Sequence, residues 1–170
     1  IKKTAIDLFS NPSRTGYTTQ DLINNELGYF YKIKPDIVTI LIGVNDYVQG
    51  YDTSYFHTNL TDILNQVQGG MKVKTNIILI TIPDYSVTPA GKNYARGRDV
   101  PNDLMVWNSI IKKEGSKRKL AVVDIFPISQ KMKDDPSLVC PDNLHPSAKE
   151  VKLWADLIEP EFTKLVKQYY

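Results

Sequence analysis

Residues 37–46 read IVTILIGVND, a β-branched apolar run that ends in a glycine and two polar side chains. A strand that is apolar on both faces is typical of the inside of a parallel sheet, where helices cover both sides. Similar runs follow at Asn76–Ile82 and Leu120–Ile125, and a shorter one, Ala5–Phe9, precedes. The stretches between them are long enough for helices. This alternation predicts an α/β fold with a parallel sheet.

One helix is expected between Ala5–Phe9 and the strand at Ile37–Ile42, and a second between that strand and Asn76–Ile82. Thr18 followed by Asp21 fits a capping box, so the first helix is expected to begin there and to run to about Lys32. The second helix is indicated by an apolar stripe and by Gly69-Gly70, which predicts its end. The stripe consists of Phe56, Leu60, Ile63, Leu64 and Val67.

The second half of the chain continues the alternation. A helix is expected over Leu104–Lys112, and a last one from near Ser147, in which Pro160 predicts a kink or a restart. The stretches without periodicity, Pro83–Pro101 and Pro127–Pro141, are expected to be long loops.

Length and composition indicate an ordinary globular protein with one domain over residues 1–170. Hydrophobic residues make up 42% of the chain and charged residues 24%, and the net charge of +2 gives no basic footprint for nucleic acid. The longest apolar runs are too short to span a membrane. A single cysteine, Cys140, excludes an internal disulfide. The compartment, cytoplasmic or secreted, stays open because the chain begins at Ile1 and not at a methionine.

Polar residues follow the predicted strands at one edge of the sheet, where open α/β sheets bind ligands. Asp142 and His145 lie three positions apart, so their side chains can be neighbours on a turn. An aspartate that holds one imidazole nitrogen leaves the other free as a general base. The alternative is a plain helix start. The other histidine, His57, flanks the apolar stripe and is expected at the surface.

A second group could stabilise negative charge on a reacting oxygen. The Asn45 amide at the end of a strand can donate a hydrogen bond to an oxyanion, and Asp46 could brace its loop. The backbone N–H of Gly16, in the loop before the capped helix, can do the same. Taken singly, each of these residues also fits an ordinary turn.

Together these stretches resemble three blocks of the SGNH (GDSL-type) hydrolases, which cleave esters with a serine. The matching segments are Asn11–Thr19, Gly43–Asp46 and Asp142–Pro146. The resemblance implies an α/β/α sandwich with a flavodoxin-like sheet. It also implies that His145 is the general base, Asp142 its orienting partner, and Gly16 and Asn45 the oxyanion donors. The implied substrate is a small ester, either an acyl ester or a carbohydrate acetyl ester, and no metal or organic cofactor is needed.

The chain departs from this family in two places. The Gly-Asp-Ser block, which in this family includes the first central strand and the nucleophilic serine, is absent from residues 1–170. Ser13 lies in the second block and therefore does not replace that serine. We therefore expect roughly one more βα unit, on the order of 30 residues, ahead of Ile1 in the same protein. These 170 residues alone are expected to be inactive. The second departure is Lys149-Glu150, expected on a helix surface, where many members have a glycine.

Aromatic residues after the strands, above all Tyr47 and Tyr85, are expected to line the substrate site, although ordinary surface tyrosines would give the same pattern.

Three rival functions remain. The chain could be a non-catalytic SGNH-like binding domain, which the retained Asp142–His145 pair argues against. It could be a metal-dependent phosphohydrolase using Asp46, Asp84 and Asp124. Finally, Cys140 could act as a thiol nucleophile, which would leave Gly43–Asp46 unexplained.

Overall fold

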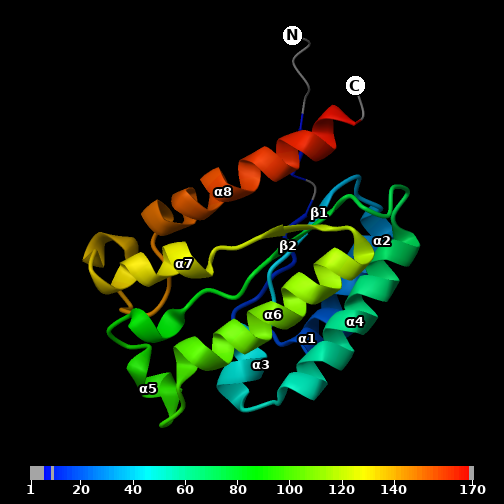
Figure 1. Cartoon of the computed structure of the whole chain (residues 1–170). Coiled ribbons are helices and arrows are strands. Elements are labelled where there is room, and N and C mark those ends of the chain that lie inside the picture. Colours follow the sequence, from blue (N-terminus) through cyan, green and yellow to red (C-terminus); the bar gives the residue numbers. More distant parts are fainter. Residues whose placement is uncertain (1–5, 9, 169–170) are drawn as a thin grey trace.

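The computed structural model describes residues 6–8 and 10–168, and these form an α/β fold with a three-stranded parallel sheet (Figure 1). The sheet order is β1-β2-β3, with Val38 opposite Ile77 and Ile80 opposite Val123. The strands are β1 (Val38–Ile40), β2 (Ile77–Ile80) and β3 (Ala121–Val123). All three lie within the runs predicted from the sequence.

Helices cover both faces of this sheet, and shorter turns join them. The long helices are α4 (Thr53–Gly70), α6 (Val100–Arg118) and α8 (Ala148–Lys167). The short ones are α1 (Thr19–Asp21), α2 (Leu27–Ile33), α3 (Val44–Gln49), α5 (Lys92–Ala95) and α7 (Phe126–Ser129). A π-helical turn, η1 (Leu22–Glu26), joins α1 to α2, and the 3-10 turns are η2 (Tyr85–Val87), η3 (Gln130–Lys133) and η4 (Pro136–Leu138). None of the described helices is long and apolar enough to cross a lipid bilayer.

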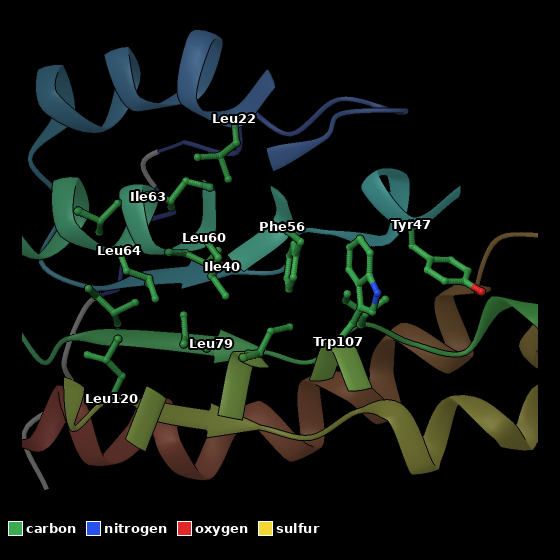
Figure 2. Packing of buried hydrophobic residues seen from close by; sticks show 14 of the residues in the cluster. Leu22, Ile40, Tyr47, Phe56, Leu60, Ile63, Leu64, Leu79, Trp107 and Leu120 are labelled. Carbon is green, nitrogen blue, oxygen red and sulfur yellow. The ribbon is translucent and has the colours of Figure 1, made fainter. Parts of the chain in front are cut away.

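Alternate side chains of β2 point into two separate cores. Ile77 and Leu79 join the larger cluster, which α4 and α6 cover, and this cluster contains the stacked rings of Phe56 and Trp107 (Figure 2). Ile78 and Ile80 join the smaller cluster on the opposite face, beneath α8 (Figure 1). The result is the predicted α/β/α layering, built on the period of two of a strand.

The outer edge of β1 carries no paired strand within the described part of the chain. The run Ile37–Ile42 has the composition of a central strand, yet Thr39 is exposed and Leu41 is 37% exposed, whereas every residue of β2 is buried. Of the predicted strand Ala5–Phe9, the described residues Ile6–Leu8 form no strand, and Ala5 and Phe9 lie outside the described residues.

Several expected elements differ in extent. The first helix begins at its predicted capping box on Thr18 but contains the wide η1 turn. Helix α6 begins at Val100, inside the predicted loop, because a proline is tolerated in a first turn. Helix α8 continues through Pro160 without restarting. The loop 127–141 contains short helical turns.

The prediction that Glu150 lies on a helix surface is wrong. Its side chain turns inward at the start of α8 and is completely buried. Oε1 accepts a hydrogen bond from the Trp154 indole at 2.6 Å, while Oε2 is buried and accepts none from the described residues. Burial raises the pKa of this carboxyl group.

Candidate active site

The turn before α8 holds an aspartate and a histidine in direct contact. Nδ1 of His145 lies 2.6 Å from Oδ2 of Asp142. The other carboxylate oxygen accepts the backbone N–H groups of Leu144 and His145, both at 2.9 Å. These backbone hydrogen bonds, with the one from the imidazole, lower the pKa of Asp142 to about 2. The carboxylate therefore stays ionised and favours a proton on Nδ1, which leaves Nε2 as a base.

The chain around this turn is closed by its own backbone. The Cys140 N–H donates to the His145 carbonyl at 2.8 Å, and Asn143, at φ +62°, donates its N–H to the Cys140 carbonyl at 2.9 Å. The Cys140 thiol donates to the Pro146 carbonyl at 3.2 Å. These contacts hold the aspartate and the histidine on a rigid support, although 58% of the His145 side chain is exposed.

The two expected oxyanion donors lie on neighbouring segments. Asn45 is in the first turn of α3, and its side-chain amide donates to the Tyr17 carbonyl at 2.9 Å. One amide hydrogen therefore remains for another acceptor. Gly16, which precedes Tyr17, is exposed, and no group among the described residues accepts its N–H. The structure thus brings Gly16 and Asn45 together.

The segment between β2 and α6 connects these two halves of the site. The Ala90 N–H donates to the Asn143 carbonyl at 2.9 Å, which ties the segment to the turn with His145. At its other end, the Arg98 guanidinium lies 4.1 Å above the Tyr47 ring centroid and donates to the Tyr47 carbonyl in α3. The segments with Tyr47, Ala90 and His145 follow β1, β2 and β3 in the chain, on the side of the sheet where α3, α5 and α7 lie (Figure 1).

The tyrosines expected to line the site are largely buried. Tyr47 is 3% exposed, contacts Trp107 edge-on and donates its hydroxyl to Asp103 at 2.6 Å (Figure 2). Tyr85 is 8% exposed. Their burial leaves these rings little surface for a ligand. The more exposed tyrosines after the strands are Tyr51 and Tyr94.

A cavity of about 760 Å³ lies against Cys140 and Asn143 of the turn before α8, but neither Asp142 nor His145 lines it. Lys92 and Lys133 contribute to its wall, as do Cys140 and Asn143. The volume is in the range of small-molecule sites. Its walls come from the two segments that the Ala90–Asn143 hydrogen bond joins.

The aspartates of the rival metal-site interpretation are engaged elsewhere. Asp46 accepts hydrogen bonds from Thr19, Asp84 from Ser86, and Asp124 pairs with Lys112 at 2.6 Å. Within residues 6–8 and 10–168, no three acidic, histidine or cysteine side chains are placed to hold a metal ion together.

Comparison with known families matches residues 3–150 to the model of the GDSL-like Lipase/Acylhydrolase family. The chain belongs to this family. The GDSL-like match covers all three segments singled out in the sequence, and the sandwich seen in the structure is the fold that the resemblance implied.

Individual relatives agree with this assignment. A multidomain esterase of Ruminococcus flavefaciens is 30% identical in an alignment of 139 residues, which covers 77% of this chain and 16% of that protein. The chain therefore spans about a sixth of the length of this relative. Among solved structures, the acetylxylan esterase Axe2 of Geobacillus stearothermophilus superposes with a TM-score of 0.68 at 21% identity, over 86% of this chain and 68% of that one. A lipase/acylhydrolase of Enterococcus faecalis gives 0.66 at 24% identity, over 86% and 70%. These likenesses show the shared fold.

Proposed function

We propose that this chain carries the base and the oxyanion donors of an ester hydrolase whose nucleophilic serine lies outside residues 1–170. The observation that carries the proposal is the 2.6 Å contact between Asp142 and His145. Two backbone N–H groups fix the aspartate, and the imidazole stays exposed. Such a pair has a direct use as a general base, whereas a plain helix start does not need it.

The mechanism is acyl transfer. Nε2 of His145 takes the proton of the serine hydroxyl as its oxygen attacks the ester carbonyl, and Asp142 stabilises the imidazolium. The Gly16 N–H and the Asn45 amide donate to the resulting oxyanion. The imidazolium then protonates the leaving alcohol. Water, activated by the same nitrogen, releases the acid from the serine.

The sheet supports a strand and helix supplied by another segment of the same protein. The outer edge of β1 has no paired strand in the described residues, and Leu41 is 37% exposed on a strand of central composition. On α8, which covers the smaller core, Val151 and Leu157 are 46% and 40% exposed. A βα unit placed beside β1 and α8 would bury this surface, and in this family such a unit carries the serine.

For the substrate we propose a small acyl ester, with acetylated carbohydrate as the first class to examine. The solved relative Axe2 is an acetylxylan esterase, and the curated relative is a multidomain esterase.

The test compares the two histidines of the full-length protein. His145→Ala is expected to lower kcat/KM for 4-nitrophenyl acetate and acetylated xylo-oligosaccharides by at least about 10³-fold. The control, His57→Ala, removes the histidine that contacts Glu114 between α4 and α6, and should change kcat/KM by less than about twofold.

A fluorophosphonate probe should add once to the wild-type protein, as measured by intact mass. Equal hydrolysis by both variants would refute the role of His145. A folded wild-type protein with neither hydrolysis nor adduct would be a non-catalytic relative.

A further inference from the structure

Asp46 is a completely buried carboxylate in α3 that the acyl-transfer chemistry does not use. Both of its oxygens are taken by Thr19, 27 positions earlier in the chain. Oδ2 accepts the Thr19 backbone N–H at 2.9 Å, and Oδ1 accepts the Thr19 hydroxyl. Thr19 is also fully buried, so this two-point contact is shielded from water.

The threonine is itself held from two sides. The Asn59 side chain, in α4, donates to its hydroxyl oxygen at 3.0 Å. The preceding residue, Thr18, forms a capping box with Asp21, donating its N–H to that carboxylate at 2.9 Å and its hydroxyl at 2.7 Å. The start of α1 therefore presents the Thr19 N–H and hydroxyl in one fixed direction.

The contact joins the two segments that carry the oxyanion donors. Asn45 directly precedes Asp46, and Gly16 lies three residues before Thr19. The Asn45 amide also donates to the Tyr17 carbonyl at 2.9 Å, so the segments meet at two neighbouring points. A shift between Asp46 and Thr19 would change the separation of the Gly16 N–H and the Asn45 amide.

Stability alone is a poor explanation for this pair. A buried carboxylate loses its hydration, and a well-packed apolar pair of similar volume is often at least as stable. Burial raises the pKa of Asp46, and the hydrogen bonds from Thr19 act in the opposite direction. What the buried contact provides is a fixed geometry between the two segments.

We infer that Asp46 and Thr19 are positioning residues that set the spacing of the oxyanion donors Gly16 and Asn45. This inference rests on the proposed function and deepens it. Both side chains are completely buried, so they act through the donors and not by contact with a substrate. Their effect is on the transition state, because donors that are misplaced by about 1 Å lose much of their stabilisation of a developing oxyanion.

The test in the full-length protein uses two threonines in matched settings. Thr19→Val removes the hydroxyl that donates to Asp46 at nearly constant side-chain volume, and Thr19→Ser restores that hydroxyl. The control is Thr81→Val, because Thr81 is also fully buried and donates its hydroxyl to an aspartate, Asp124, at 2.9 Å. Thr81 forms no hydrogen bond with residues 16–19 or 45–46 in the described structure.

Thr19→Val should lower kcat for 4-nitrophenyl acetate by about 10- to 100-fold with KM changed less than about threefold. Thr19→Ser and Thr81→Val should stay within about threefold of wild-type kcat. The side-chain amide resonances of Asn45 should shift, and exchange faster with solvent, in Thr19→Val only.

Equal losses of kcat in the two valine variants, or unchanged Asn45 resonances in Thr19→Val, would overturn the inference. The Asn45 resonances report on the Thr19–Asp46 contact and do not require that the protein hydrolyses a substrate. Failure of the proposed function, seen as no hydrolysis by the wild-type protein, is therefore a separate result.

Discussion

Replacing Gly43 by alanine tests whether the loop that carries Asn45 depends on a close approach to the core. Gly43 precedes α3 at φ +115°. A Cβ atom there would lie 2.5 Å from Cε2 of Phe56 and 3.0 Å from Cδ1 of Ile82. Phe56 is fully buried and stacks on Trp107, with the ring centroids 4.6 Å apart, so it has no free space to enter.

Two costs add in this variant. A left-handed backbone costs an alanine about 1–3 kcal/mol. Overpacking against the Phe56 ring costs about 1–3 kcal/mol more. We therefore expect Gly43→Ala to lower the free energy of unfolding by about 4 kcal/mol. For a domain of this size, that is roughly 10 °C in Tm.

Gly50→Ala is the matched control. Gly50 ends the same helix at φ +92°, but no heavy atom lies within 4 Å of the position of its Cβ. Only the backbone cost applies, about 2 kcal/mol and roughly 5 °C. Urea and thermal unfolding, followed by circular dichroism, would measure both variants. If Gly43→Ala and Gly50→Ala lower the free energy of unfolding by amounts that agree within about 0.5 kcal/mol, the steric argument is refuted.

Two further predictions concern carboxyl groups at the start and the approach of α8. Burial raises the pKa of Glu150, so the wild-type protein loses stability as the pH rises above the unfolded-state value near 4.3, about that of a free glutamate. Glu150→Gln should therefore raise Tm by roughly 3 °C at pH 8, which corresponds to about 1 kcal/mol of stability. In thermal melts this gain should vanish near pH 4. A gain that is independent of pH would contradict the prediction. Asp142→Asn should lower kcat by about 10²–10⁴-fold with KM nearly unchanged, because an amide cannot stabilise the imidazolium of His145; steady-state kinetics that show a purely KM effect would contradict it.

The sequence was sufficient for the elements whose signals are local. Short, β-branched apolar runs such as Asn76–Ile82 indicate a buried strand, and the Thr18 capping box marks the beginning of the first helix. The Asp142–His145 contact was also predictable, because only three residues separate its partners. Helix α6 was predicted to begin too late because Pro101 is typical both of a loop and of a first helical turn.

Contacts between distant residues were not predictable in this way. Asp46 was expected to brace its loop, but nothing in the sequence identified Thr19 as its partner. The burial of Tyr47 depends on Trp107 and Asp103 in another helix. Glu150 faces inward because Trp154, one turn later, offers it a donor. Each of these outcomes depends on tertiary packing, which short patterns do not encode.

The outer edge of β1, which no strand of the described residues covers, also has a consequence for how copies of this chain behave toward one another. Ile37–Ile42 carries no charge, proline or glycine, which are the residues that keep edge strands apart. Two copies with bare edges can pair through this hexapeptide and build an intermolecular sheet. A strand paired with β1 would block this route, so these 170 residues expressed alone should be prone to self-association.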